Sequence, residues 1–341
     1  MNNNRLPRLK YIEPQTVEDV LELKKKYGKE SLILAGGTDV IPLLKRRNIS
    51  CRCLISVKKI PELKNISFDK NEGITIGAAV TLRELIDNKT ISDAYPILSK
   101  AAGSVAYNQI RNMATLVGNI CLDNKCTFFN QSKLWWQSRK DCFKRGGDRC
   151  FVVKKSNHCH ALSAADTVSA LIALDAGLVI RGRSDTRRIA VEDFFTGDGR
   201  RPHHLQEDEF VTAVGIPPSE SGWRHGYKKK SLRGSVDFAI ASMSLRLRSN
   251  GCIAEDMRIV LNGISTKPVR ALKTERRLIA EGIRAETIEA SAGLLLKEVA
   301  PISSIGATVP LRKRMIAAML EDLMGNVTGD AQRHPEKVSI K

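Results

Sequence analysis

The 341-residue sequence lacks several features that would point directly to a function. No run approaches eighteen apolar residues, and residues 1–15 hold no apolar signal core, so we expect a cytoplasmic protein without membrane contact. Aromatic residues are only 5% of the chain, which is sparse for stacking on single-stranded nucleic acid. We find no Ser/His/Asp triad and no catalytic carboxylate pair, and we therefore expect no catalytic residue.

Acidic residues are also in the minority. The chain has 55 Lys and Arg against 37 Asp and Glu, a formal net charge of +18. A field of this sign attracts nucleic acid, an anionic membrane, an acidic protein or a phosphorylated ligand, and charge alone does not choose among them. Hydrophobic residues at 42% and charged residues at 27% are typical of a folded chain. The length leaves room for two or three domains.

The N-terminal part predicts alternating helices and strands. A capping box formed by Thr16 and Asp19 predicts a helix over Val17–Tyr27, which Gly28 would end. Further strands are expected at Ser31–Leu34, Cys53–Val57, Ile66–Phe68 and Gly73–Gly77, and helices up to about Arg46 and over Thr81–Asn88 and Ser92–Ala102. Helical and strand periodicity are both absent between about residues 122 and 162. A loop of this length implies either a function or a covalent or metal cross-link that holds it.

Periodicity returns after this segment. The predicted elements are a helix at Ala165–Ala176, a strand at Leu178–Arg181, antiparallel strands at Ala239–Leu247 and Ile253–Val260 around Asn250-Gly251, and helices at about Ala271–Ala280, Ala285–Val299 and Leu311–Met324. The segment Ile216–Gly222, rich in Pro, Ser and Gly, is the best candidate linker. The polar residues from Gly325 onward are expected to fray.

Two turns contain small and polar residues suited to a ligand. In the first, Ile33–Val40, two glycines follow a strand and precede a helix, so backbone N–H groups could cradle phosphate. The pattern is neither GxGxxG nor a P-loop, and an ordinary tight turn is the alternative. The second, Asn108–Asn119, could by itself be a surface loop.

Together, these turns resemble the FAD-binding subunits of molybdenum hydroxylases, a family that includes the flavin domains of xanthine dehydrogenase and the medium subunit of carbon monoxide dehydrogenase. Further matches follow in the same order: Ala164-Ala165-Asp166, Asp193–Gly197 (DFFTG), Tyr227-x-Lys229 and Ser235-x-Asp237-Phe238. The resemblance covers about residues 8–325. It implies an α+β fold with FAD-binding subdomains at 1–60 and 61–218, a C-terminal domain of antiparallel sheet and helices at 223–325, and a flexible tail at 326–341.

The resemblance also implies FAD as a cofactor. Its pyrophosphate would lie on backbone N–H groups of the two turns, Asp166 would serve the ribose or adenine end, and Lys229 would lie near the isoalloxazine. The expected cofactor-binding residues are Ile33, Leu34, Ala35, Gly36, Gly37, Thr38, Asp39, Val40, Thr115, Leu116, Val117, Gly118, Asn119, Asp166 and Lys229. Ala114 and Val117 stand where the family often has glycine.

Five of the eight cysteines fall within 39 residues, which in a cytosolic chain indicates metal or redox chemistry. Cys126, Cys142, Cys150 and Cys159 are spaced C-x15-C-x7-C-x8-C. Four thiolates can hold a [4Fe–4S] cluster or zinc, but zinc sites usually use tight C-x2–4-C pairs, so the wide spacing favours the larger cluster. The other cysteines, Cys51, Cys53, Cys121 and Cys252, are interpreted as structural, and His158 and His160 as neighbours rather than ligands.

The cysteine segment is an insertion relative to plain members of the family, since Asn119 and Asp166 are 47 positions apart. Its sequences CLDNKCTFFNQS, CFKRGGDRC and NHCHA resemble the β subunits of 4-hydroxybenzoyl-CoA reductases, which carry a [4Fe–4S] cluster there. This resemblance implies electron flow from reduced ferredoxin through the cluster and FAD to [2Fe–2S] clusters in a small subunit. The electrons would end at a molybdenum cofactor in a large subunit, in a dimer of heterotrimers.

Two alternatives stay open. The chain could be the flavin subunit of another molybdenum hydroxylase, acting with a large subunit that oxidises a purine, an aldehyde or a heterocycle. It could instead be a zinc-stapled basic protein that binds nucleic acid. We favour the reductase subunit, with no nucleic-acid partner.

Overall fold

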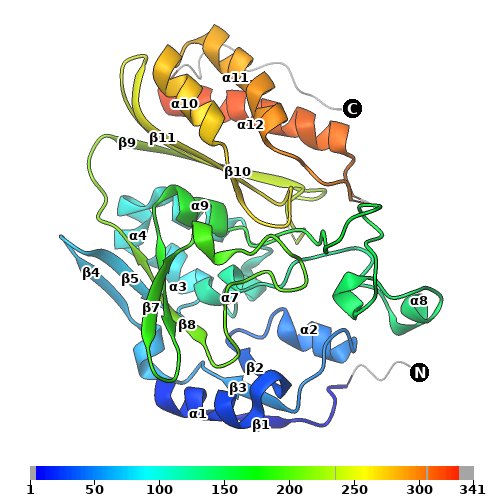
Figure 1. Ribbon diagram of the computed structural model, residues 1–341. Coiled ribbons are helices and arrows are strands. Elements are labelled where there is room, and N and C mark those ends of the chain that lie inside the picture. Colours follow the sequence, from blue (N-terminus) through cyan, green and yellow to red (C-terminus); the bar gives the residue numbers. More distant parts are fainter. Residues whose placement is uncertain (1–4, 235, 305, 330–341) are drawn as a thin grey trace.

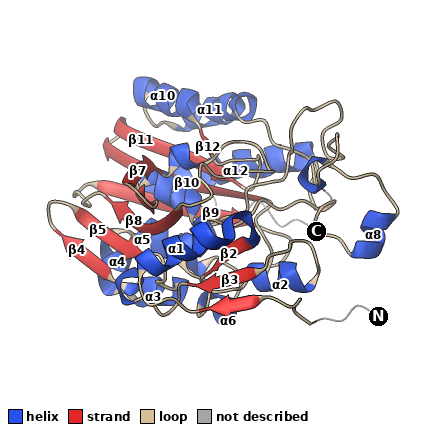
Figure 2. Ribbon diagram, turned by 60° about the horizontal axis from the view of Figure 1, so that its bottom comes forward, coloured by secondary structure: helices blue, strands red, loops and turns tan. Residues whose placement is uncertain are grey.

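The computed structural model describes residues 5–234, 236–304 and 306–329, and its strands form three sheets (Figure 1). The α+β class expected from the sequence is confirmed. Figure 2 shows the helices, in blue, packed beside and between the strands, in red. Among the described helices, none is long and apolar enough to cross a membrane.

The first sheet is parallel, in the order β1-β3-β2, with strands β1 (Lys10–Ile12), β2 (Ser31–Leu34) and β3 (Cys53–Ser56). Helices α1 (Val17–Tyr27) and α2 (Val40–Lys45) accompany it. The capping box is confirmed, since the Thr16 side chain accepts a hydrogen bond from the Asp19 N–H and the Asp19 side chain bonds the backbone of Thr16. Strand β1 was not expected, because its three residues are too few for a period.

The second sheet has the order β4-β5-β8-β6-β7 and is antiparallel throughout. Its strands are β4 (Ile66–Asp69), β5 (Gly73–Gly77), β6 (Gly177–Arg181), β7 (Thr186–Ala190) and β8 (Phe210–Ile216). Its helices are α3 (Leu82–Asp87), α4 (Lys89–Ala94), α5 (Pro96–Gly103), α6 (Asn108–Arg111), α7 (Leu116–Ile120) and α9 (Val168–Ala173). The helix expected at Ser92–Ala102 is in fact two helices, because Pro96 starts a new one at its N1 position.

The third sheet, β12-β11-β10-β9, belongs to the C-terminal part. Its strands are β9 (Trp223–Lys230), β10 (Ala241–Asn250), β11 (Ile253–Asn262) and β12 (Val269–Arg270). Helices α10 (Leu272–Glu281), α11 (Ala285–Glu298) and α12 (Val309–Thr328) cover one face, as Figure 1 shows. Helix α12 continues to Thr328, so the expected tail is helical at its start; residues 330–341 lie outside the described residues.

Two hydrophobic cores hold these layers. One is shared by the first two sheets and runs from Val20 and Ile55 to Leu82 and Val214; the other lies under the C-terminal helices. The predicted division near residue 60 therefore separates two sheets that share one core.

The segment around residues 122–162 leaves the fold through a narrow neck. Lys125 and Leu162 exchange two backbone hydrogen bonds of 2.8 Å, and the segment between them holds only the short helix α8 (Lys133–Gln137) and single turns. Single turns elsewhere are Gly28–Glu30, Pro61–Lys64 and Glu192–Phe194, and within the segment Phe143–Arg145. Figure 1 shows α8 at the side of the molecule, away from all three sheets.

Candidate cofactor site and cysteine cavity

A cavity of about 660 Å³ lies between the two predicted turns and the β9–β10 connection. This volume falls within the usual range of cofactor sites. Twelve of the expected cofactor residues line it: Ile33, Ala35, Gly36, Gly37, Thr38, Asp39, Val40, Thr115, Val117, Gly118, Asn119 and Asp166. Leu34, Leu116 and Lys229 do not. Leu34 follows Ile33 on the strand and so faces the opposite side, and Leu116 is fully buried in the core.

The two turns touch through their backbones at Gly36. A Cβ at this position would lie 2.0 Å from the Met113 carbonyl oxygen and 2.8 Å from the Ala114 Cα. Only glycine allows so close an approach. The neighbouring Gly37 has φ +71°, a conformation that favours glycine for a different reason. Both glycines are thus required by the geometry of the turn itself.

The second turn is two short helices, not a loop: the partly exposed helix α6 begins it and the start of helix α7 ends it. The Thr115 side chain caps α7 by accepting a hydrogen bond of 3.0 Å from the Gly118 N–H. The Asn119 side-chain oxygen accepts hydrogen bonds from the backbone and the hydroxyl of Thr167, at 3.2 and 2.7 Å. Val117 lines the cavity from the same helix. This turn therefore presents backbone and small side chains to the cavity, while the Asn119 amide is used to hold α9.

Asp166 and Lys229 form a buried ion pair. The Lys229 Nζ lies 2.7 Å from Asp166 Oδ2 and also donates to the Ser104 carbonyl oxygen at 2.9 Å. Burial raises the pKa of Asp166 to about 6, although Lys229 opposes the shift. The two residues expected at different ends of the flavin are therefore in direct contact, and only Asp166 lines the cavity.

Asp166 also has a free acceptor. Its Oδ1 is buried and has no hydrogen-bond partner within the described part of the chain, and the residue lines the cavity. A buried carboxylate oxygen without a partner is costly. A ligand hydroxyl would satisfy it, so the residues present fit a sugar- or ribityl-bearing cofactor.

Sequence reasoning assigned no role to three residues at the cavity mouth. Ala106 and Val236 both have positive φ, +42° and +74°, and the Val236 N–H donates to the Ala106 carbonyl oxygen at 3.4 Å. Positive φ in a β-branched residue is rare outside constrained sites. Phe238 lines the same edge and is half exposed. The S-x-D-F motif marked this loop in the sequence, but the positive φ values of Ala106 and Val236 are visible only in the structure.

The four insertion cysteines converge on one small cavity, of about 10 Å³. Cys142 and Cys159 are buried, and Cys126 and Cys150 are partly exposed. Burial raises the pKa of Cys159 to about 11, and the nearby Cys126 and Cys150 add to this effect. Among the described residues, however, no three His, Cys, Asp or Glu side chains lie close enough to hold a metal ion. The fold gathers the quartet but does not set it at ligand spacing, so the thiol side chains would have to turn to hold a cluster.

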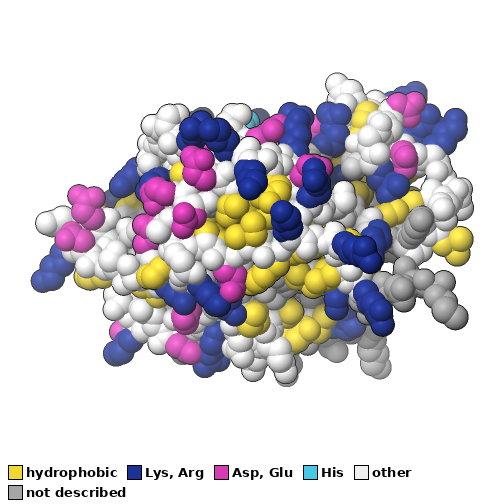
Figure 3. Space-filling view, turned by 90° about the horizontal axis from the view of Figure 1, so that it is seen from below, with side chains coloured by type: hydrophobic (Ala, Val, Ile, Leu, Met, Phe, Trp, Pro, Cys, Tyr) yellow, Lys and Arg dark blue, Asp and Glu magenta, His cyan; other side chains and the backbone are white. Residues whose placement is uncertain are grey.

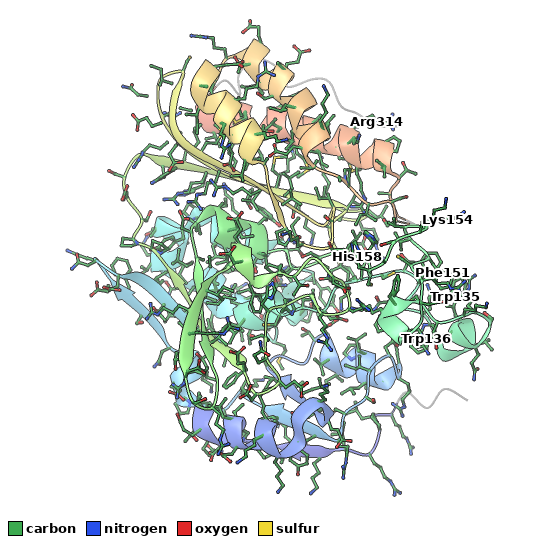
Figure 4. All side chains as sticks on the ribbon, in the orientation of Figure 1. Trp135, Trp136, Phe151, Lys154, His158 and Arg314 are labelled. Carbon is green, nitrogen blue, oxygen red and sulfur yellow. The ribbon has the colours of Figure 1, made fainter. Side chains whose placement is uncertain are left out.

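Cations stack on the aromatic side chains of the insertion, beside this cavity. The guanidinium of Arg139 lies 3.8 Å from the Trp135 ring centre, that of Arg145 lies 3.9 Å from the Trp136 centre, and Lys144 Nζ lies 5.2 Å from the Phe129 centre. Figure 4 shows Trp135, Trp136 and Phe151 together at the side of the molecule. The insertion is therefore an aromatic and cationic shell.

The remaining cysteines and histidines lie apart from the quartet cavity or have other partners. Cys121 lines the large cavity, where burial raises its pKa to about 12. Cys252, interpreted from the sequence as structural, is exposed. The His158 and His160 rings lie 4.2 Å apart, and His160 Nε2 is 2.7 Å from the Ser156 hydroxyl. That contact occupies one imidazole nitrogen of His160.

Comparison with known proteins gives matches along most of the chain. The family model described as FAD binding domain in molybdopterin dehydrogenase matches residues 7–219, and that of the CO dehydrogenase flavoprotein C-terminal domain matches residues 226–327. The xanthine dehydrogenase FAD-binding subunit of Escherichia coli O157:H7 is 24% identical over 322 residues, which are 94% of this chain and 96% of that protein.

Two further comparisons agree. An aldehyde oxidoreductase FAD-binding subunit of Escherichia coli K12 is 29% identical over 306 residues, 85% of this chain and 90% of that protein. A solved structure of carbon monoxide dehydrogenase from Hydrogenophaga pseudoflava has a TM-score of 0.79 at 22% identity, covering 96% of this chain and 99% of that one. The structural likeness establishes the fold.

Proposed function

Because the chain belongs to the FAD-binding subunits of the molybdenum hydroxylase family, we propose that it relays electrons between FAD in the large cavity and a [4Fe–4S] cluster held by the four insertion cysteines. The observation that carries the flavin part is the cavity formed by the two turns. The observation that carries the cluster part is the convergence of four thiols, widely spaced in sequence, on one cavity.

The residues of the large cavity suit the cofactor. Backbone N–H groups of the Gly36–Val40 turn and the Val117 N–H at the start of helix α7 would bind the pyrophosphate, since both segments line one cavity. The Gly118 N–H is already bonded to the Thr115 side chain. Asp166 Oδ1 would accept a hydroxyl hydrogen bond, with Lys229 holding the carboxylate in place. Bound FAD would supply one- and two-electron chemistry. The protein binds and orients this group, and no side chain is proposed to react covalently.

The insertion suits a reducible cluster by its charge. Lys144 is almost fully buried beside the cysteine cavity, where it pairs with Asp123 at 2.7 Å. Arg149 also lines that cavity. Cations near thiolate-bound iron offset its negative charge and favour reduction. The phenylalanine side chains of the cavity would limit access by water.

The partners follow from the same proposal. We propose a large subunit with a molybdenum cofactor, a small subunit with [2Fe–2S] clusters, and reduced ferredoxin as the donor, in a dimer of heterotrimers. The substrate would be 4-hydroxybenzoyl-CoA, bound by the large subunit. The matched proteins named for xanthine dehydrogenase and aldehyde oxidoreductase support a second candidate equally, a hydroxylase that acts on another substrate.

A different class, a zinc-stapled nucleic-acid-binding protein, is less well supported. Figure 3 shows Lys and Arg side chains scattered among acidic ones on the face seen there, rather than gathered in one stripe. A nucleic-acid backbone favours a continuous basic surface.

The test is the metal and flavin content of the protein purified without oxygen. We expect one flavin and about four iron and four sulfide per chain. The Cys142→Ser variant should lose iron and keep flavin, because the insertion lies outside the flavin cavity. Gly37→Val should do the reverse, since its φ is +71° and its Cβ would lie 3.2 Å from Ile41. Cys51→Ser, outside the insertion, should keep both. Stoichiometric zinc, or full iron in Cys142→Ser, would overturn the cluster assignment.

A further inference from the structure

We propose that Lys125 is a positioning residue that couples the cysteine insertion to the flavin cavity by placing a fixed positive charge on the wall between them. This inference rests on the proposed function. It assigns a role to a residue that is neither a predicted metal ligand nor part of the predicted flavin turns.

Lys125 lies between the two sites. It directly precedes Cys126, and together they line a cavity of about 280 Å³ beside the cysteine quartet. Its side chain extends the other way, where Nζ pairs with Asp39 Oδ1 at 2.5 Å. Asp39 belongs to the first turn and lines the flavin cavity. The backbone of Lys125 is therefore next to the proposed cluster ligand Cys126, while its side chain contacts the wall of the flavin cavity.

A second contact supports the same placement. Lys125 Nζ lies 5.6 Å from the ring centre of Phe238, which also lines the flavin cavity. The ammonium thus bridges the first turn and the β9–β10 connection, two parts of the wall that are 199 residues apart in sequence (238 − 39). The side chain is only 14% exposed, so solvent screens it weakly.

The neck of the insertion fixes this charge. The paired hydrogen bonds between Lys125 and Leu162 clamp the backbone, and the Asn124 amide next to it donates to the carbonyl oxygens of Ala161 and Thr266, at 2.9 and 2.8 Å. Asn124 is 1% exposed. The position of the ammonium therefore depends on the neck and not on the loops that follow.

The consequence is electrostatic. Reduction adds negative charge to a bound flavin, so a fixed cation on the wall of the flavin cavity stabilises the reduced form more than the oxidised form, by an amount that falls as its distance from the ring grows. Asp39 opposes this effect from the same wall. Removing Lys125 leaves the Asp39 carboxylate unbalanced, whereas removing the carboxylate leaves the ammonium unbalanced. The two losses should shift the flavin potential in opposite directions.

The experiment measures the flavin midpoint potential of the full chain by spectroelectrochemistry, with iron and flavin content determined on each sample. We expect Lys125→Met to shift the potential negatively and Asp39→Asn to shift it positively. The double variant should return towards the wild-type value, and Lys125→Arg should keep it. Lys140→Met is the matched control, an insertion lysine that is exposed and has no ion pair among the described contacts.

Shifts of the same sign in the two single variants, or an unchanged potential in both, would overturn the coupling and leave a purely structural ion pair. If Lys125→Met binds too little flavin for a potential, Asp39→Asn and the double variant still decide: a positive shift in Asp39→Asn that the double variant reverses supports the charge on the wall, and an unshifted Asp39→Asn overturns it. If the wild-type protein contains no iron but the variants still shift the flavin potential in opposite directions, the cluster assignment is wrong and the role of the Lys125 charge stands.

Discussion

Gly36→Ala is the sharpest test of how the cofactor cavity is built. The added methyl group would sit 2.0 Å from the Met113 carbonyl oxygen, and backbone cannot move aside as a flexible side chain could. Overpacking of this kind costs about 1–3 kcal/mol. For a domain of this size that lowers the melting temperature by roughly 2–4 °C per kcal/mol.

The same change should weaken flavin binding. Separating the two turns moves N–H donors of one turn away from a pyrophosphate held by the other. A hydrogen bond to a charged group is worth about 1.5–3 kcal/mol, so losing one lowers affinity roughly tenfold or more. The assays are thermal unfolding of the apoprotein and flavin titration followed by fluorescence.

Gly103→Ala is the matched control. Gly103 ends helix α5, is exposed, and a Cβ there meets nothing within 4 Å. Alanine should leave stability unchanged or raise it by about 0.5–1 kcal/mol, without effect on flavin. If Gly36→Ala matched this control in both assays, the turns would not be in backbone contact, and the account of the cavity would be wrong.

The helix cap at Thr115, the Asp166 carboxylate and the net charge give four further predictions. Thr115→Ala removes the side-chain cap of helix α7 and should lower the free energy of unfolding, measured with denaturant, by about 1 kcal/mol. Thr115→Ser keeps a hydroxyl for the Gly118 N–H and should retain most of the wild-type stability. Burial raises the pKa of Asp166 to about 6, so its contribution to apoprotein stability is fully present below the pKa of the unfolded state, near 3.8, and is lost as the pH rises through about 6. Asp166→Asn should abolish this pH dependence of the free energy of unfolding. Flavin affinity should change in the opposite sense, weakening below about pH 6 as the carboxylate is protonated; a flat profile would remove Asp166 from the site. With ferredoxin as the proposed donor, electron uptake should slow steeply with added salt, because the chain carries a net charge of +18; a stopped-flow rate independent of ionic strength would remove this role of the charge.

Local chemistry made much of the fold predictable. The capping box at Thr16 and the strand at Ser31–Leu34 depend on neighbours within four residues, and both are confirmed. The Asn250-Gly251 turn likewise fixes the β10–β11 hairpin. Elements without such signals were missed, such as strand β7, whose sequence TRRIA has no apolar face.

The candidate site was predictable as a set of segments but not as a geometry. The glycine turn and the cysteine quartet were recognisable because each has an unusual composition over a short stretch. Their roles in the site depend on other segments: Gly36 is required by Met113, and the Asp166 carboxylate faces Lys229 rather than a separate end of the ligand. No periodicity in either stretch contains that information.

The sequence by itself therefore determined which residues are available for phosphate, flavin and metal, since residue type and local spacing are properties of the chain. Only the tertiary structure decided which of them share a wall. The Lys125–Asp39 pair joins positions 86 residues apart, and it exists because the neck of the insertion packs beside the first turn. Such contacts follow from how the layers pack against each other, and packing is fixed by the whole chain at once.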